Sequence, residues 1–283
     1  MKVIKSVPAM QQYSLAAKKH GKIIGVVPTM GYLHAGHTSL IDLVRAKTEI
    51  VIVTIFVNPT QFGANEDLSN YPRDFERDLQ LCEQHGADVV FAPEPDDMYC
   101  ADRSVWVIEE KLSRGLCGRS RPEHFRGVTT VVAKLFNITL PDVAIFGQKD
   151  AQQALVLQRM VRDLNFPVEV IVAPIVREAD GLAMSSRNRY LSENERKSAL
   201  CISRSLFNAE LQIKKNGLAA LGEILSSVWD NIREAGGAID YVEGLDADTL
   251  EPVTEHTVAI LIAVAAGFGR ARLLDNILVK IKD

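Results

Sequence analysis

Apolar segments that alternate with helical patterns run from about residue 22 to residue 176, and they constrain the fold more than any other feature of this chain. Six of these segments have the length and composition of strands: Ile23–Val27, Ile50–Val57, Asp88–Ala92, Val105–Ile108, Asp142–Phe146 and Val168–Val172. The stretches between them include three helical patterns, Tyr71–Gln84, Val128–Asn137 and Ala151–Asn165. This alternation predicts βαβ units around a parallel sheet.

The segment Ile50–Val57 is apolar at nearly every position, which is typical of a strand buried on both faces of a sheet. In such sheets the ligand crevice lies at the carboxyl ends of the strands. Chemically suggestive residues follow three of the predicted strands: the H-A-G-H turn His34–His37, Asn58–Phe62 and Gly147–Asp150. We therefore predict an α/β fold with a Rossmann-like, doubly wound parallel sheet, and one crevice to which these segments contribute.

The pattern changes after Asp180-Gly181, where a turn is predicted. Two long helical patterns with polar faces follow, and then three short strand-like segments: Glu193–Lys215, Leu218–Ala235, Asp240–Gly244, Val258–Val264 and Arg272–Leu274. This order predicts a second, smaller α+β domain at the C-terminal end. We place the first domain at residues 1–185 and the second at residues 186–283.

Two histidines lie in the segment Pro28–His37, between a predicted strand and a helical pattern at Thr38–Lys47. Main-chain N–H groups and the positive end of a helix dipole meet at such a turn, which makes it a natural phosphate site. His34 and His37 can donate hydrogen bonds to phosphate oxygens, and Gly36 lets a ligand approach the main chain. The alternative interpretation is two ordinary histidines on the surface or in the core.

A second polar segment, Met184-Ser185-Ser186-Arg187-Asn188, lies near the predicted domain junction. Two hydroxyl groups followed by a guanidinium suit a phosphate group, because the guanidinium can bond two oxygens at once. A polar turn with a capping serine is the alternative. Together with the H-x-G-H turn, the segment resembles the adenylyl- and cytidylyltransferase superfamily.

Within that superfamily, six ordered motifs narrow the resemblance. They run from Val26 to Leu191 and read VVPTMGYLHAGHxSL, IFVNPTQF, NYPR, RPxHFRGV, FGQKDxQQ and READGLAMSSRNxYL. The chain is similar to the pantothenate synthetase family of ligases, which join pantoate and β-alanine at the expense of ATP. One departure is Glu123 in the RPxHF motif, where glycine is frequent, and it places the conformation of that loop in question.

The resemblance implies a reaction in two steps. The pantoate carboxylate attacks the α-phosphate of ATP, which releases pyrophosphate and leaves a pantoyl adenylate. The amine of β-alanine then attacks this intermediate, which gives pantothenate and AMP. No protein nucleophile is required, so catalysis would depend on holding the reactants in line and on stabilising phosphate charge.

The resemblance also implies roles for individual residues. His34 and His37 would bind the phosphates, with His37 as proton donor, while Lys149 would neutralise charge on the α-phosphate and pyrophosphate. Ser185, Ser186 and Arg187 would clamp the triphosphate, and the main chain of Val176 would contact adenine. The full set of implied ATP-binding residues is Met30, Gly31, Tyr32, Leu33, His34, Ala35, Gly36, His37, Gly147, Gln148, Lys149, Asp150, Val176, Met184, Ser185, Ser186 and Arg187.

Pantoate carries hydroxyl groups, a carboxylate and a gem-dimethyl group, so its pocket requires amide side chains among apolar surface. Gln61 and Gln153 match the family's pantoate-binding pair, and Gln61 would also lie near β-alanine. Taken alone, either glutamine could be an ordinary solvated residue. His124 and Arg126 are further candidates for anion contact.

Composition argues against several classes of partner and site. The formal net charge is −4, which gives no general attraction to nucleic acid. The four cysteines show neither a C-x-x-C pair nor zinc spacing, so we expect reduced thiols and no protein-bound metal. No segment has the pattern of a signal peptide or a membrane span, so we expect a cytoplasmic protein. The resemblance implies a homodimer, with Mg²⁺ bound through the ATP phosphates.

Two other functions are alternatives to the ligase. A nucleotidyltransferase would release a nucleotide-linked product without an amine, but Gln61, Gln153 and the complete READGLAMSSR segment argue against it. A non-catalytic, RNA-binding relative of aminoacyl-tRNA synthetases is disfavoured by the negative net charge and by the intact His34, His37, Lys149 and Arg187.

Overall fold

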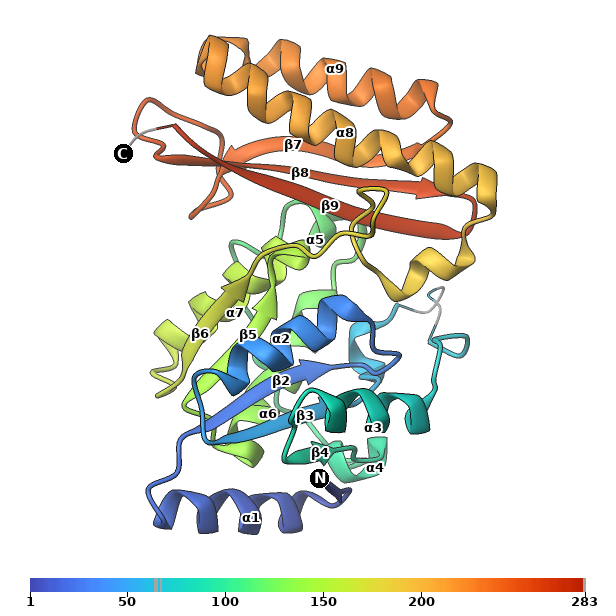
Figure 1. Ribbon diagram of the computed structural model, residues 1–283. Coiled ribbons are helices and arrows are strands. Elements are labelled where there is room, and N and C mark those ends of the chain that lie inside the picture. The colour runs from blue at the N-terminus through green and yellow to red at the C-terminus, as the bar shows by residue number, and fades with distance from the viewer. Residues whose placement is uncertain (64–65, 67, 282–283) are drawn as a thin grey trace. The chain divides into compact units, whose positions relative to one another are not determined.

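The computed structural model of the protein describes residues 1–63, 66 and 68–281, and its chain divides into two compact units (Figure 1). Unit 1 comprises Met1–Ser113, Arg121–Gln148 and Gln153–Pro174. Unit 2 comprises Arg114–Ser120, Lys149–Gln152 and Ile175–Asp283. No helix in the described ranges is long and apolar enough to cross a membrane.

Unit 1 contains a six-stranded sheet in the order β1-β4-β3-β2-β5-β6, in which every pairing is parallel. The strands are β1 (Lys2–Ile4), β2 (Ile24–Thr29), β3 (Ile50–Ile55), β4 (Val89–Phe91), β5 (Val143–Gly147) and β6 (Glu169–Ala173). The strand order reverses between β2 and β5, which pair at Gly25 and Val143. Ligands in open α/β sheets bind outside the carboxyl ends of strands at such a switch point.

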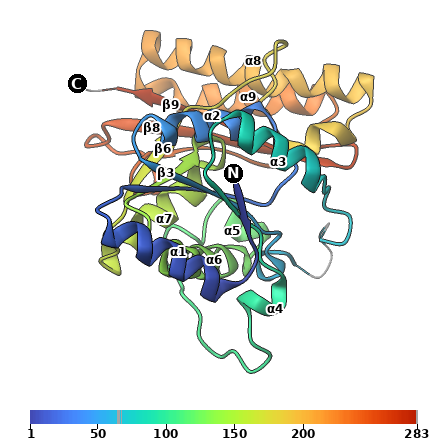
Figure 2. The ribbon, with the colours of Figure 1, turned by 60° about the horizontal axis from the view of Figure 1, so that its bottom comes forward.

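Helices cover both faces of this sheet (Figure 2). The helices α1 (Val7–Lys19) and α6 (His124–Thr139) lie on one side, and α2 (Ala35–Arg45) and α3 (Phe75–Gln84) lie on the other. Alternate residues of β2 enter the two cores: Val26 packs with α1, α6 and α7 (Ala151–Asp163), and Val27 packs with α2 and α3. This period of two in a doubly apolar strand produces the three-layer arrangement.

Unit 2 contains an antiparallel sheet in the order β7-β8-β9, with strands β7 (Ala238–Asp246), β8 (Ala259–Phe268) and β9 (Ala271–Lys280). Two helices, α8 (Glu193–Asn216) and α9 (Leu221–Glu234), bury their apolar faces in one core with β8 and β9. The short elements of the chain are η1 (Pro59–Gln61), α4 (Pro95–Met98), α5 (Cys117–Ser120), η2 (Gln148–Asp150), η3 (Ser186–Tyr190) and η4 (Leu218–Ala220). The predicted fold class is therefore confirmed.

The prediction of a strand at Val105–Ile108 is wrong. This segment pairs with no strand in the described residues, and the side chains of Val105 and Ile108 are 79% and 60% exposed. Its main chain is held by α6 instead: Val107 N–H donates to Thr130 Oγ1 at 3.0 Å, and Thr129 Oγ1 donates to Val107 O at 2.6 Å. Aromatic and β-branched residues raise strand propensity, but propensity does not supply an available sheet edge.

The packing of α6 against η1 generates a prediction about Gly127. A Cβ atom at this position would overlap the carbonyl group of Thr60 and lie 2.7 Å from Gln61 Cα. Main-chain atoms cannot rotate away, so Gly127→Ala should separate α6 from η1 and lower the free energy of unfolding by about 1–3 kcal/mol. Chemical denaturation measures this loss.

Gly222→Ala in α9 is the matched control, because a Cβ atom there would meet nothing within 4 Å. We expect this variant to be as stable as the original protein or slightly more stable. Equal stability of the two variants would show that α6 does not require close approach to η1.

Candidate active site

Two histidines cap the N-terminus of α2 directly after the turn that follows β2. His34 is the N-cap residue, and its Nδ1 accepts a hydrogen bond from Gly36 N–H at 3.1 Å. The Nδ1 atom of His37 accepts from His34 N–H at 3.3 Å. The two rings lie against each other, with centroids 4.0 Å apart and planes inclined by 38°. Each imidazole therefore satisfies a main-chain donor at the start of the helix.

These hydrogen bonds define the tautomer of both rings. A ring nitrogen that accepts an N–H carries no hydrogen, so each neutral imidazole carries its hydrogen on Nε2. Nε2–H is a donor that can bond a phosphate oxygen at a helix N-terminus. The cap thus gives His34 and His37 the chemistry that the sequence assigned to them, although their contact with ATP stays a prediction.

The predicted pantoate residue Gln61 is held by Asn58, whose side chain is 1% exposed. Asn58 Nδ2 donates to Gln61 Oε1 at 3.1 Å and to Gly127 O at 3.2 Å. Asn58 Oδ1 accepts from Tyr99 Oη at 2.7 Å. Gln61 Nε2 in turn donates to Met30 Sδ at 3.2 Å, which joins the segments after β2 and β3.

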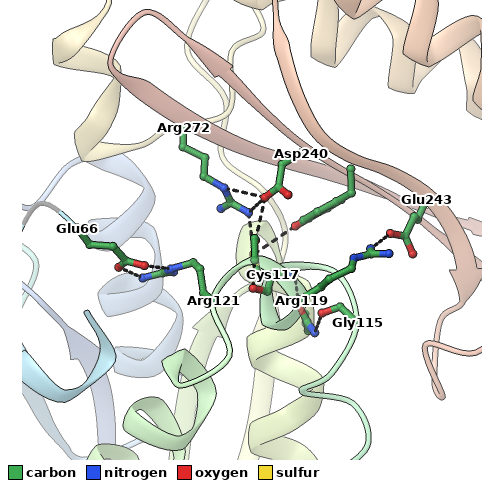
Figure 3. Close-up of polar contacts among 11 residues, drawn as sticks. Glu66, Gly115, Cys117, Arg119, Arg121, Asp240, Glu243 and Arg272 are labelled. Atoms are coloured by element: carbon green, nitrogen blue, oxygen red, sulfur yellow. Dashed lines mark hydrogen bonds and ion pairs between the residues drawn. The ribbon is translucent and has the colours of Figure 1, made fainter. Parts of the chain in front are cut away.

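The main-chain carbonyl of Gln61 is held by the RPxHF motif. His124 Nδ1 donates to it at 2.9 Å and Arg121 Nη2 donates to it at 3.2 Å. Arg121 also forms an ion pair with Glu66 (Figure 3). Burial alone would raise the pKa of Glu66, but the Arg121 guanidinium outweighs it and holds the pKa below its ordinary value.

Glu123, the one departure from the family motif, is the N-cap residue of α6. Its carboxylate forms an ion pair with Arg126 at 2.9 Å, and the Arg126 guanidinium lies 4.4 Å from the ring centroid of Trp106. Because the glutamate side chain is 76% exposed, this pair contributes little to stability. The anion-contact roles of His124 and Arg126 stay predictions.

Lys149 belongs to unit 2, whose sheet fixes its main chain. Asn276 on β9 is 3% exposed, and its Nδ2 donates to Lys149 O at 3.0 Å. Lys149 Nζ lies 3.7 Å from a carboxylate oxygen of Asp150. Three residues on, Gln152 donates to Gly115 O at 2.8 Å and accepts from the N–H of Cys117 at 3.0 Å.

The segment Arg114–Ser120 is attached to β7 by two charged contacts (Figure 3). Arg119 pairs with Glu243, and Ser120 Oγ donates to Asp240 Oδ2 at 3.0 Å. The register of β7 shifts between Ile239 and Tyr241, so Asp240 lies in a bulge that interrupts the strand pairing. The segments Arg114–Ser120 and Lys149–Gln152 are thus both attached to the sheet of unit 2.

Val176 and Met184, both predicted to contact ATP, are adjacent in a hairpin of unit 2. Met184 N–H donates to Val176 O at 3.0 Å. The hairpin is attached to β9 by Arg177, which donates to both oxygens of Asp275 at 2.6 and 2.9 Å. Ser185 then caps the 3-10 helix η3 by accepting from Arg187 N–H at 3.3 Å. The capping role of the serine and its predicted role toward phosphate are compatible, because a hydroxyl both accepts and donates.

Some contacts at the site were not predicted from sequence. No motif pointed to Asn276 as the partner of the Lys149 main chain, or to Arg77 and Asp78 of α3, which contact the turn before His34. The capping function of the two histidines was also not foreseen. Gln153 lies on α7 in unit 1, and its partnership with Gln61 on one substrate stays a prediction.

A histidine-capped helix N-terminus beside the switch point of a doubly wound parallel sheet defines a nucleotide-binding α/β enzyme of the H-x-G-H type. The family model described as pantoate-beta-alanine ligase matches residues 2–278. The chain therefore belongs to the pantoate–β-alanine ligase family.

Relatives of known name support this assignment over the full length. The pantothenate synthetases of Acetivibrio thermocellus and Thermotoga neapolitana are 52% and 54% identical to the chain, covering 99% and 98% of it and 100% and 99% of their own lengths. The solved pantothenate synthetase of Thermus thermophilus is 40% identical, with a TM-score of 0.92 and complete coverage of both chains. The pantoate-beta-alanine ligase of Francisella tularensis, solved in complex with beta-gamma ATP and beta-alanine, is 32% identical with a TM-score of 0.81, covering 98% of this chain and 97% of its own.

The contacts of Asn58 predict a loss of stability on its removal. Asn58→Ala leaves Gln61 Oε1 and Gly127 O without this donor, and we expect the free energy of unfolding to fall by about 1–3 kcal/mol. Tyr99→Phe deletes one hydrogen bond to the same side chain and a longer one, 3.3 Å, between Tyr99 Oη and Thr60 Oγ1, and it should cost about 1 kcal/mol. Denaturant titration compares the two, and an equal or smaller loss for Asn58→Ala would contradict the prediction.

The Glu66–Arg121 pair predicts that the free energy of unfolding depends on pH. The folded-state pKa of Glu66 lies below its unfolded value of about 4.5. The pair therefore stabilises the folded protein fully above pH 4.5, and this stabilisation is lost as the pH falls through the folded-state pKa. Between pH 5 and pH 3, the unfolding free energy of the original protein should therefore fall more steeply than that of Glu66→Gln. The exposed Glu110→Gln serves as control and should follow the original curve; a Glu66→Gln curve parallel to both would refute the prediction.

Proposed function

We propose that the chain catalyses the ATP-dependent ligation of (R)-pantoate and β-alanine to pantothenate, with AMP and pyrophosphate as the other products. The observation that carries the proposal is the cap of α2, where His34 and His37 are both set as Nε2–H donors beside the switch point of the sheet. Membership of the pantoate–β-alanine ligase family supplies the substrates.

In the first step, a pantoate carboxylate oxygen forms a bond to the α-phosphorus of ATP. The bond from that phosphorus to the oxygen bridging to the β-phosphate breaks, and pyrophosphate leaves with the electron pair. We assign His37, His34, Lys149 and Arg187 to this step. His37 would donate a hydrogen bond as negative charge moves onto the leaving group, and the cations would stabilise that charge.

We propose that ATP is bound by the turn from Met30 to His37, the segment Gly147–Asp150, Val176 and the segment Met184–Arg187. The hairpin that joins Val176 to Met184 supports the grouping of the last two. The Val176 carbonyl retains a second lone pair after accepting from Met184, so a further contact there is chemically available. Gln61 and Gln153 would bind pantoate, and Gln61 would also lie near β-alanine.

In the second step, the β-alanine amine attacks the acyl carbon of the pantoyl adenylate. The C–N bond forms, the C–O bond to AMP breaks, and the nitrogen loses a proton to solvent. The acyl adenylate already provides a good leaving group, so we assign no protein nucleophile. The contribution of the protein to this step is orientation and exclusion of water.

We propose that the phosphate oxygens of ATP would hold Mg²⁺, and that no protein side chain would be required as its ligand. Among the described residues, no group of three or more His, Cys, Asp or Glu side chains is placed to hold a metal ion. The donors of the α2 cap suit an anion. When bound, the ion would supply neutralisation of phosphate charge. A homodimer, a cytoplasmic location and a lid function for residues 186–283 stay predictions from the family resemblance.

The proposal is tested by measuring AMP and pyrophosphate release from ATP, Mg²⁺ and pantoate, with and without β-alanine. We expect sustained AMP formation that requires β-alanine. His37→Ala should lower the rate by about 100-fold or more, because a preorganised donor to the transition state is worth about that much. His256→Ala, which changes a histidine that is 89% exposed, is the matched control and should retain the full rate.

Each failure has a distinct meaning. Pyrophosphate release without amine dependence would identify a nucleotidyltransferase in place of a ligase. No turnover in the original protein would refute an enzymatic function for this site. Equal rates for His37→Ala and His256→Ala would remove His37 from the catalytic group.

A further inference from the structure

The three residues before His34 have their main-chain N–H groups bonded to side chains. Gly31 N–H donates to Thr29 Oγ1 at 3.2 Å. Tyr32 N–H and Leu33 N–H donate to the two carboxylate oxygens of Asp78, each at 2.7 Å. The turn that leads into the histidine cap is therefore built by side chains and not by regular secondary structure.

The backbone of this turn is strained. Gly31 has φ +80° and Tyr32 has φ +51°, and both values lie in the left-handed region. Glycine adopts that region freely, whereas a residue with a Cβ atom adopts it at a cost of about 1 kcal/mol and needs surroundings that enforce it. The carboxylate of Asp78 bonds Tyr32 N–H and the N–H that follows, so it is the group that enforces this conformation.

Asp78 is a costly residue at this position. Its side chain is 1% exposed, and burial raises the pKa of its carboxyl group although the two N–H groups and Arg77 oppose that effect. A buried carboxylate adds little to the stability of a folded protein, because the cost of removing it from water offsets most of its attraction to its hydrogen-bond donors. Arg77 lies on the same helix, and its Nη1 donates to Leu33 O at 2.9 Å. We call Asp78 and Arg77 together the clamp.

The clamp ends one residue before the cap. His34 N–H is the donor that His37 Nδ1 accepts, and His34 O accepts from His37 N–H at 2.7 Å. Any displacement of Leu33 therefore moves the main-chain groups that orient the His37 ring. Asp78 has both oxygens engaged with main-chain donors, which makes it unsuited to acting on substrate directly.

We propose that Asp78 is a positioning residue for transfer of the adenylyl group: its carboxylate holds the left-handed turn at Tyr32 and thereby sets the His34–His37 cap in its donor geometry. This inference rests on the proposed ligase function. It assigns to α3 a part in the first step of the reaction and none in the second.

The test separates the two half-reactions. The first is followed by pyrophosphate release in the complete reaction, and the second by pantothenate formation from chemically prepared pantoyl adenylate and β-alanine. Asp78→Asn keeps the side-chain size but turns an NH₂ group toward one of the two N–H donors. We expect it to lower kcat of the complete reaction by 10- to 100-fold and to leave the rate from pantoyl adenylate within about twofold.

Asp142→Asn is the matched control. Asp142 also accepts from a main-chain N–H and a cation, Ile24 N at 2.7 Å and Lys18 Nζ at 2.5 Å, but it does so at the opposite end of β2 from the histidine cap. We expect this variant to lose stability and to keep both rates within about twofold.

A double variant tests the route of the effect. If Asp78 acts through His37, adding Asp78→Asn to His37→Ala should lower kcat by less than threefold further. Should Asp78→Asn fail to fold by circular dichroism, the comparison is made with Asp78→Glu, which keeps both acceptor oxygens but displaces them. We again expect a slower complete reaction and an unchanged rate from pantoyl adenylate.

The outcomes are distinguishable. Equal losses in both half-reactions, or full multiplication of the two losses in the double variant, would overturn the positioning role. An unchanged kcat in Asp78→Asn would overturn it too, while the ligase function would stand. Absence of β-alanine-dependent AMP release in the original protein would instead refute the proposed function itself.

Discussion

The cap that His34 and His37 form on α2 determines both the local fold and the hydrogen-bond donors of the candidate site. One pair of hydrogen bonds ends the turn after β2, starts α2 and assigns the hydrogen of each neutral ring to Nε2. A helix N-terminus already favours an anion through its N–H groups and dipole. The cap adds two side-chain donors while its Nδ1 atoms accept from the N–H groups of His34 and Gly36. Local folding and proposed chemistry therefore use the two nitrogens of the same rings, with Nδ1 capping the helix and Nε2–H left as the donor.

The surrounding contacts hold main-chain groups more often than they hold functional side chains. Asp78 bonds two N–H groups before the cap, Arg121 and His124 bond the carbonyl of Gln61, and Asn276 bonds the carbonyl of Lys149. Fixing the main chain sets the position from which each side chain can reach a ligand. This arrangement is the form of preorganisation that electrostatic catalysis requires.

The sequence predicted most of the fold, for identifiable reasons, and it showed the motifs of the candidate site, whose roles toward ligands stay predictions. Apolar segments buried on both faces have a strong local signal, so β2, β3 and β5 were placed within a few residues. Val105–Ile108 has a similar local signal but pairs with no strand among the described residues, because the threonines of α6 hold its main chain instead. The H-x-G-H turn was visible as a motif. Asp78 was not, because its partners lie more than 40 residues away in the sequence and a lone aspartate in a helix carries no pattern.

Activation of a carboxylate as an acyl adenylate can be followed with pantoate labelled with oxygen-18 in its carboxylate. The AMP formed in the complete reaction is then analysed by mass spectrometry. Attack of the carboxylate on the α-phosphorus, followed by aminolysis at carbon, predicts that one labelled oxygen per turnover appears in AMP. AMP without label, or label in pyrophosphate, would contradict the account, because the oxygen would then have been transferred to a different phosphorus or not transferred at all.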